Sequence, residues 1–264
     1  MFDFAYHRPT SLEEAERLLS GASDGALVAG GMTLIPALKQ RLASPSDVID
    51  LAGVAGLSGI SQAGGAIAVG ALTPHALVAS DAVVMARIPA LAALAAKIGD
   101  PQVRNRGTLG GSIANNDPAA DYPAAVLGLG ATVTTNRREI AADDFFTGMF
   151  ETALEDGEIV TAVSFPVPEK AGYAKFPNPV SRYAVVGVLV SRGPAGTRVA
   201  VTGAGPCVFR STELEQALAG SFTAAAVDTV TVAAEGLNSD IHAGAEYRAH
   251  LVGVMAKRAV TACG

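Results

Sequence analysis

The pattern of hydrophobic positions at the start of the chain predicts a small unit that alternates helices and strands. Apolar residues stand at positions 12, 15, 18 and 19, which share one face of an α-helix, and Thr10 or Ser11 can cap that helix. The elements predicted after it are a buried strand over 26–29, a helix over 34–42 and a second strand over 46–51. This order indicates a subdomain of about residues 1–56.

A second unit, expected over about residues 57–168, begins with alternation typical of paired strands near Ile60 and 66–69. Thr73 before Pro74 favours a helix start with threonine as the cap. The further elements predicted are a helix over 88–98 stopped by Gly99-Asp100-Pro101, a helix over 122–127, and strands over 132–134 and 159–167.

Two prolines, Pro166 and Pro168, mark the expected boundary between an N-terminal domain over 1–168 and a smaller domain over 169–264. The elements predicted in the second domain are strands over 183–191 and 198–202 and helices over 212–218 and 247–262. The order of the elements predicts an α+β fold in both domains.

Two glycine-rich segments stand out, 29–36 (AGGMTLIP) and 108–118 (TLGGSIANNDP). Each combines glycines with small hydroxyl residues, a composition that lets backbone N–H groups close around a phosphate. The second segment is predicted to be a loop, because glycines, asparagines and a proline interrupt any helical or strand-like period of apolar positions. Two such segments favour a diphosphate held from both sides, and therefore a dinucleotide.

Neither segment has the spacing of a Rossmann or Walker motif. From the residues alone, 30–34 is equally explained as an ordinary strand-to-helix turn whose glycines supply positive φ, and 115–118 as an Asx turn.

Composition narrows the class of protein. Of 264 residues, 50% are hydrophobic and 17% are charged, as expected for a folded protein. The formal charge of −6 comes without a dense basic run, so a nucleic-acid partner is not expected. The apolar stretches are too short to span a bilayer, and the N-terminus lacks the features of a secretory signal. We therefore expect a cytoplasmic protein.

The cysteine count limits the metal chemistry. Cys207 and Cys263 are the only cysteines, without CxxC spacing. An iron–sulfur cluster is normally held by four thiolates, so such a centre would have to lie on another chain. No metal site is expected here, and the set Asp240, His242 and Glu246 is read as structural.

The ordered set of motifs resembles the FAD-binding medium subunits of molybdenum hydroxylases, the family of carbon monoxide dehydrogenase medium chains and xanthine dehydrogenase FAD domains. The resemblance implies a two-subdomain FAD-binding domain of the PCMH type, similar to vanillyl-alcohol oxidase, followed by a smaller α+β domain. The motifs that carry it are 29–36, 106–112, Asn115 with 117–121, 175–176, 181–188, 201–206, 239–243 and 246–248.

Position by position, the resemblance implies that two backbone stretches hold the pyrophosphate of noncovalent FAD and that Asp121 anchors the adenosine half. Lys175 is expected near the flavin ring, and Tyr183 is expected to cover one ring face. The full set of implied cofactor residues is Leu27, Val28, Ala29, Gly30, Gly31, Met32, Thr33, Leu34, Ile35, Ile98, Thr108, Leu109, Gly110, Gly111, Ser112, Asn115, Asp117, Asp121, Val160 and Lys175.

From the residues alone, a solvated surface position is the more usual fate of a lysine such as Lys175, and Tyr183 is as readily explained as a core aromatic. Met32 and Ser112 depart from the family, which often has Gln or His at the first position and Asn at the second. Of the histidines, His75 is expected in the first turn of a helix and His242 in an interface or domain contact.

The implied function is electron relay. In the resembled enzymes a large subunit with the molybdenum cofactor selects and oxidises substrate, a small subunit with two [2Fe-2S] clusters carries the electrons, and FAD passes them to an acceptor. The resemblance implies a dimer of such three-chain units. Two alternatives stay open at this stage: an independent FAD-dependent oxidoreductase of the same fold, and an assembly subunit that has lost FAD.

Overall fold

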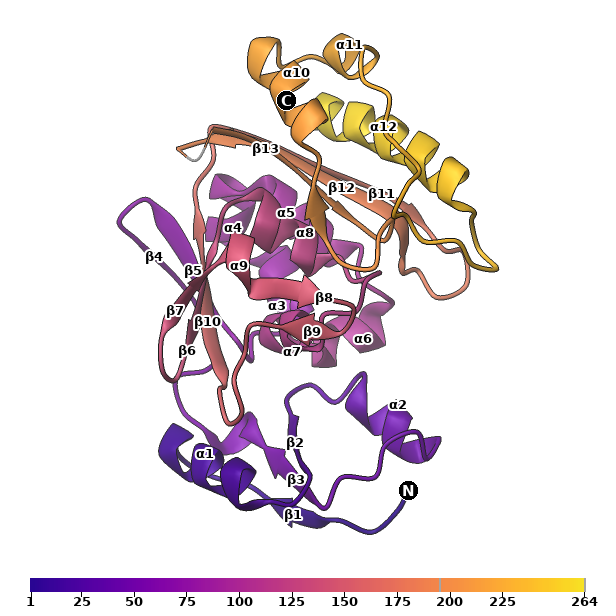
Figure 1. The fold of residues 1–264 in the computed structure, drawn as a ribbon. Coiled ribbons are helices and arrows are strands. Elements are labelled where there is room, and N and C mark those ends of the chain that lie inside the picture. The colour runs from indigo at the N-terminus through magenta and orange to yellow at the C-terminus, as the bar shows by residue number, and fades with distance from the viewer. Residues whose placement is uncertain (195, 264) are drawn as a thin grey trace.

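The computed structural model describes residues 1–194 and 196–263. Its N-terminal part is a three-stranded parallel sheet with the order β1-β3-β2, covered by helix α1 (Figure 1). The elements are β1 (Ala5–His7), α1 (Leu12–Gly21), β2 (Gly25–Val28), α2 (Leu34–Lys39), β3 (Asp47–Asp50) and the 3-10 helix η1 (Leu51–Gly53). The predicted helices and strands of this unit are confirmed, and β1 is an additional strand.

Helix α1 begins where its sequence indicates. The Ser11 hydroxyl accepts a hydrogen bond from the Glu14 N–H, and the Glu14 carboxylate accepts one from the Thr10 N–H. These two bonds satisfy backbone donors that a helix start leaves without partners. Ala15 on the inner face is fully buried beside Ile49 of β3 in the local apolar core.

The central part contains a five-stranded antiparallel sheet with the order β4-β5-β10-β6-β7. Its strands are β4 (Ile60–Ala63), β5 (Ala66–Gly70), β6 (Thr132–Thr135), β7 (Glu139–Ala141) and β10 (Val160–Pro166). Alternate residues of β5 and β10 are buried, which matches the alternation in the sequence.

A group of helices lies against this sheet and shares its core (Figure 1). They are α3 (His75–Ser80), α4 (Ala82–Arg87), α5 (Pro89–Ala96), α6 (Pro101–Arg106), α7 (Leu109–Asn115), α8 (Tyr122–Gly128) and α9 (Ala142–Phe145), with the strand pair β8 (Phe146–Gly148) and β9 (Glu151–Thr152). Helix α5 is alanine-rich and mostly buried, as predicted.

Two predictions in this region are wrong. Thr73 does not cap α3: its hydroxyl bonds to the backbone of Gly59, and Pro74 occupies the cap position. The second glycine segment is a helix and not a loop, because the Thr108 hydroxyl accepts from the Gly111 N–H and starts α7, which Asn116 ends in a left-handed conformation. A good cap outweighs the low helix propensity of the two glycines.

The C-terminal part is a four-stranded antiparallel sheet, β11-β12-β13-β14, between two layers of helices (Figure 1). Helix α12 packs on one face, while α5 and α8 of the central part contact the other. The elements are β11 (Lys170–Pro177), β12 (Ala184–Gly193), β13 (Gly196–Thr202), β14 (Phe209–Arg210), α10 (Thr212–Gly220), α11 (Ala224–Val227) and α12 (Ala245–Thr261). Strand β12 is buried on both faces over most of its length, which explains its continuous apolar run.

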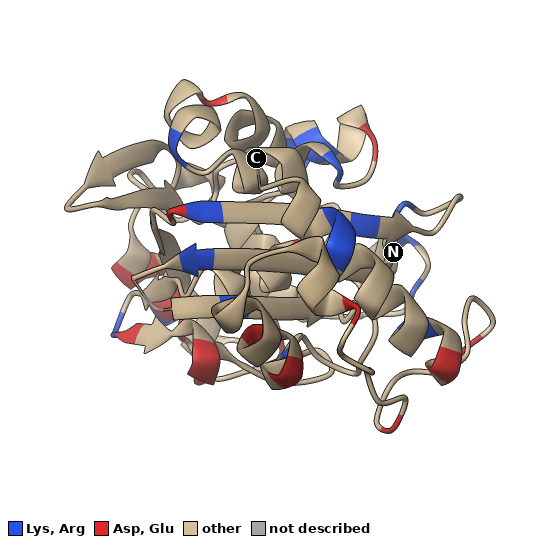
Figure 2. Ribbon diagram, turned by 90° about the horizontal axis from the view of Figure 1, so that it is seen from above, with Lys and Arg blue, Asp and Glu red and all other residues tan. Residues whose placement is uncertain are grey.

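Charged residues are spread around the molecule. In Figure 2 basic and acidic positions are interspersed over helices, strands and loops. Among the described residues, no helix has the length and apolar character that crossing a membrane requires.

Candidate functional site

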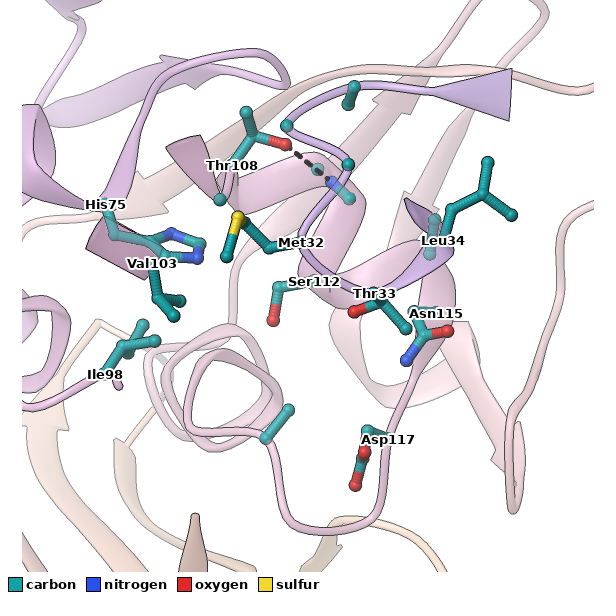
Figure 3. A pocket seen from close by; sticks show the side chains of 18 of the residues that line it. Met32, Thr33, Leu34, His75, Ile98, Val103, Thr108, Ser112, Asn115 and Asp117 are labelled. Atoms are coloured by element: carbon teal, nitrogen blue, oxygen red, sulfur yellow. Dashed lines mark hydrogen bonds between the residues drawn. The ribbon is translucent and has the colours of Figure 1, made fainter. Parts of the chain in front are cut away.

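A cavity of about 620 Å³ lies between the N-terminal unit and the central helices. Its walls come from the loop between β2 and α2, the starts of α3 and α7, the loop before α6, and residues 181–183 before β12. Figure 3 shows side chains from these separate segments directed toward a common space. Segments more than 150 residues apart in the chain therefore meet at one site.

The loop from Ala29 to Thr33 is pressed against the second glycine segment. A Cβ atom at Gly30 would lie 1.9 Å from the carbonyl oxygen of Arg106, and Gly31 has a φ of +73°. At Gly30 any side chain would clash with that carbonyl. At Gly31 any other residue would be strained in the left-handed region, which glycine enters freely. The two glycines therefore hold the first loop in contact with the residues before α7.

This loop leaves a row of backbone donors unpaired. Among the described residues, the N–H groups of Gly30, Gly31, Met32 and Thr33 donate no hydrogen bond. The Thr33 hydroxyl also makes no capping bond to α2. Successive free N–H groups in such a turn form a concave site that suits an anion.

The second glycine segment differs from the first. Its N–H groups are used inside the fold: Gly110 donates to the Ala71 carbonyl at 2.8 Å, Leu109 to Thr73, and Gly111 to the Thr108 hydroxyl. A Cβ at Gly110 would lie 2.5 Å from the Ala71 Cβ, so this glycine allows α7 to pack on the end of β5. The segment presents Ser112 and Asn115 side chains to the cavity (Figure 3).

A buried ion pair closes one end of the cavity. The Lys175 ammonium donates to the Asp121 carboxylate at 2.9 Å, and both side chains are less than 5% exposed. The Tyr173 hydroxyl donates to the other carboxylate oxygen. Burial raises the pKa of the Asp121 carboxyl, and the positive charge of Lys175 opposes that rise.

Lys175 also fixes the loop that leads to Tyr183. Its ammonium donates to the carbonyl of Lys97 at the end of α5, at 2.8 Å, and to the carbonyl of Arg182 at 2.9 Å. The Arg182 guanidinium in turn donates to the Gly99 carbonyl at 3.3 Å. The three ammonium protons therefore join strand β11 to three other segments, at Asp121, Lys97 and Arg182.

Tyr183 stands where two cavities adjoin. It lines the main cavity and also a second cavity of about 370 Å³, which shares Asp117 and Ser181 with the first. The residue is 45% exposed, so the alternative interpretation of Tyr183 as a core aromatic is wrong and the residue is accessible from the mouth of the site.

His75 forms part of the wall without a hydrogen bond from its ring. The residue is 4% exposed, and Nδ1 is buried without a partner. Burial, together with the charge of Arg104, lowers its pKa to about 4, so the ring is neutral at pH 7. Its place in the first turn of α3 confirms the sequence prediction, but nothing local in the sequence indicates that it reaches the cavity.

Most of the implied cofactor residues meet at this cavity. The exceptions are Ile35, Leu109 and Lys175: Leu109 is buried in the core, Ile35 packs under the first loop, and Lys175 lies behind Asp121. Lys175 is buried, so its interpretation as a solvated surface lysine is wrong. Wall residues outside the implied set include Leu51, Ala71, Leu72, His75, Val103 and Gly107.

The described residues contain no group of three or more His, Cys, Asp or Glu side chains arranged to hold a metal ion. The two cysteines are both free thiols, and Cys263 has its pKa raised to about 11 by burial. The cavity wall offers backbone donors, hydroxyls, amides and carboxylates.

Two family models match the chain. Residues 2–168 match the family described as "FAD binding domain in molybdopterin dehydrogenase", and residues 183–263 match "CO dehydrogenase flavoprotein C-terminal domain". The two matches follow one another along nearly the whole sequence.

Similar curated proteins match over almost their full length. The chain is 37% identical to the nicotine 6-hydroxylase medium subunit of Paenarthrobacter nicotinovorans, covering 98% of this chain and 96% of that protein. It is also 37% identical to the carbon monoxide dehydrogenase medium chain of Afipia carboxidovorans, covering 97% and 95% respectively.

Solved structures agree with these matches. A chain of reconstituted CO dehydrogenase from Oligotropha carboxidovorans superposes with a TM-score of 0.92 at 33% identity, covering 99% of this chain and 97% of that chain. A chain of quinoline 2-oxidoreductase from Pseudomonas putida 86 superposes with a TM-score of 0.88 at 31% identity, covering 99% and 96%. The mixed α/β architecture with two successive domains is common to them.

Proposed function

Because the chain belongs to the family of FAD-binding medium subunits of molybdenum hydroxylases, we propose that it is the electron-transfer flavoprotein of a heteromeric enzyme. It binds FAD noncovalently, accepts electrons from [2Fe-2S] clusters on a small partner subunit, and passes them to an external acceptor. As an oxidoreductase subunit with an FAD-binding domain, it carries out the last electron-transfer step of the overall reaction.

The observation that carries the proposal is the row of free N–H groups at 30–33 on the wall of a cavity of about 620 Å³. The volume lies within the roughly 300–1,000 Å³ typical of cofactor sites. A diphosphate needs several donors in a concave arrangement, and the loop presents them without a side chain at two positions. The residues present therefore fit FAD.

The parts of the wall suggest separate roles. The 30–33 backbone and the Thr33 hydroxyl hold the diphosphate, while Ser112 and Asn115 face it from α7. Leu51, Leu72 and Val160 form an apolar section that suits an aromatic ring. The expected contact between Asp121 and the adenosine half stays a prediction, since that carboxylate already accepts from Tyr173 and Lys175.

FAD, when bound, supplies the redox chemistry, because its ring system stores two electrons and exchanges them with carriers. The chain's own contribution is binding, orientation and control of access. Tyr183 is placed to cover the mouth of the cavity, and the buried Lys175 holds its loop in position. Access for the electron acceptor is therefore proposed along the side that Tyr183 lines.

The proposed partner subunits carry the metal centres of the complex. With two cysteines, it has too few thiolates for a [2Fe-2S] cluster. From the family to which the chain belongs, we infer that both clusters lie on a small subunit and the molybdenum cofactor on a large subunit, in a dimer of heterotrimers. The proposed division of this chain is an FAD-binding domain over 1–168, with subdomains over about 1–56 and 57–168, and a C-terminal domain over 169–264.

Affinity purification of the full chain from its native cells tests the proposal, with subunits, FAD, iron and molybdenum quantified together. Recovery with a molybdenum-containing large chain and an iron–sulfur small chain, at about one FAD per copy, supports the relay function. If the chain is recovered without other subunits, contains FAD and turns over a substrate, an independent flavoenzyme is favoured. Recovery in a complex but without FAD would favour an assembly subunit.

A further inference from the structure

The imidazole of His75 lies against the glycine that precedes α7. A Cβ at Gly107 would be 2.6 Å from Nε2, so the ring occupies the space that a side chain at Gly107 would fill. The His75 N–H donates to the Gly107 carbonyl at 3.0 Å, which fixes the backbone of the two residues together. Figure 3 shows the ring directed from the start of α3 toward the cavity, on the side of Met32 and Val103.

The ring has no hydrogen-bonding role within the fold. Nδ1 is buried without a partner, and among the described side chains neither ring nitrogen makes a hydrogen bond. Its aromatic neighbour is Tyr122 of α8, with ring centroids 5.2 Å apart, and the Tyr122 hydroxyl is also unpartnered. A buried polar group without a partner costs stability. Nε2 is not among the enclosed unpartnered atoms, so it is the ring nitrogen that is available to a bound molecule.

Burial first, and then the charge of Arg104, keep His75 neutral by lowering its pKa. Helix α6 places Arg104 near the ring, and burial together with that charge lowers the His75 pKa to about 4. Helix α5, which also packs on α3, contributes no charged side chain, and α4 contributes Arg87 at its end. A neutral imidazole has one N–H donor and one acceptor, so it can donate to an oxygen without carrying charge.

We propose that His75 is a cofactor-contacting residue whose Nε2 donates a hydrogen bond to an oxygen in the ribityl-diphosphate part of FAD. The inference rests on the proposed function, and it adds a binding residue that the glycine segments do not contain. The Nε2–H tautomer follows from the geometry, because it leaves the enclosed Nδ1 as an acceptor and directs the donor toward the cavity. His75 and Gly30 both lie against Gly107, so the ring stands beside the 30–33 backbone donors.

FAD titration of the FAD-stripped full chain tests this inference, with thermal unfolding measured for every variant. His75→Phe retains an aromatic ring and removes the donor, so we expect its FAD dissociation constant to rise at least about 10-fold, as for loss of a hydrogen bond to a charged or strongly polar oxygen. His75→Gln restores an N–H donor and is expected to recover part of that loss. Tyr122→Phe removes the neighbouring hydroxyl, which is not on the cavity wall, and is expected to bind FAD like the wild type.

A second measurement uses the wild-type chain, so it does not depend on whether a variant folds. In the wild-type chain with ¹⁵N-labelled histidine, FAD should shift the His75 ring resonances and leave those of His7 and His250 unchanged. Wild-type affinity in folded His75→Phe, or unshifted His75 resonances on saturation with FAD, would overturn the inference and leave the proposed function intact. Failure of the wild-type chain to bind FAD would instead contradict the proposed function itself.

Discussion

Lys175 of β11 and Asp121 at the start of α8 form an ion pair of 2.9 Å that is almost completely removed from solvent. The pair joins the C-terminal sheet to the central helices at the end of the cavity. Two charges taken out of water are costly unless each is compensated, and here the remaining donors of Lys175 bond to two backbone carbonyls while Tyr173 donates to Asp121. The Lys175 ammonium and the Asp121 carboxylate therefore have all the partners that their burial requires. Removing one side chain leaves another buried group without its partner, which destabilises the fold.

Lys175→Met is expected to destabilise the full chain by about 3–5 kcal/mol, because it leaves the Asp121 carboxylate buried without its cation. Urea unfolding of the FAD-free chain measures this. Lys39→Met, which removes an exposed lysine from the end of α2, is the control and should change stability by less than about 0.5 kcal/mol.

The double variant Lys175→Met with Asp121→Asn should be less destabilised than the sum of the two single variants, because it removes both charges together. A Lys175→Met chain as stable as the wild type, or strictly additive effects, would show that the ion pair does not connect the two parts as described.

Gly30→Ala is expected to reduce FAD affinity by at least about 10-fold and to lower the unfolding temperature. The new Cβ would sit 1.9 Å from the Arg106 carbonyl oxygen, so the loop has to move away from the end of α6. An overpacked contact of this kind costs about 1–3 kcal/mol. Gly21→Ala is the matched control, since no atom lies within 4 Å of the added Cβ. Equal FAD affinity in both variants would contradict the assigned role of the 30–33 loop.

The lowered pKa of His75 predicts that the stability of the folded chain depends on pH. Its pKa is lowered from 6.5 to about 4 in the folded chain, so between these values the unfolded state binds more protons and stability falls as pH falls. His75→Phe should therefore lose less stability than the wild type between pH 6.5 and 4, by on the order of 3 kcal/mol. Chemical unfolding of both FAD-free chains across this range measures the difference, and parallel curves would contradict it.

Glu158 predicts a further loss of stability at lower pH. Its carboxylate accepts from Arg138 Nε and Nη2, both at 3.0 Å, and from the Thr135 hydroxyl at 2.8 Å. The Arg138 hydrogen bonds are the largest cause that lowers the Glu158 pKa to about 2. The stabilisation is thus complete above about pH 4.5 and is lost as pH falls through 2.

Glu158→Gln should destabilise the chain at pH 7 by on the order of 2 kcal/mol, because it weakens charged hydrogen bonds next to the start of β10. The difference from wild type should shrink toward pH 2. Glu155→Gln alters an exposed partner of the same arginine and should have little effect at any pH. Unfolding curves at pH 7 and at acid pH measure both variants, and an equal loss in the two at pH 7 would contradict the account.

Local sequence signals predicted much of the framework. The Ser11 cap, the alternation in β5 and the alanine-rich helix α5 each follow from residues close in the chain, and the structure confirms them. The positive φ expected of the glycines in the first segment is found at Gly31, because it is a local property. Both interpretations of that segment, a turn and a phosphate cradle, are compatible with it. Strand β11 was missed, and its residues pair with β12 residues that lie 7 to 22 positions away, from Pro177↔Ala184 to Lys170↔Arg192.

The features that the sequence did not indicate depend on distant contacts. The N–H groups of Gly110 and Leu109 are used by Ala71 and Thr73 on another element, so composition alone suggested a second set of free donors. The burial of Lys175 requires α5 and α8 to pack against β11, and the position of His75 on the cavity wall requires the contact with Gly107. Such relationships exist only in the assembled fold.

The most direct test of the central claim is the flavin content of the purified full chain after reconstitution with FAD and removal of the excess. The account predicts about one FAD per chain, released into the supernatant by acid precipitation as expected for noncovalent binding, with the ratio strongly reduced in Gly30→Ala. A wild-type chain that is folded yet retains no FAD would contradict the account.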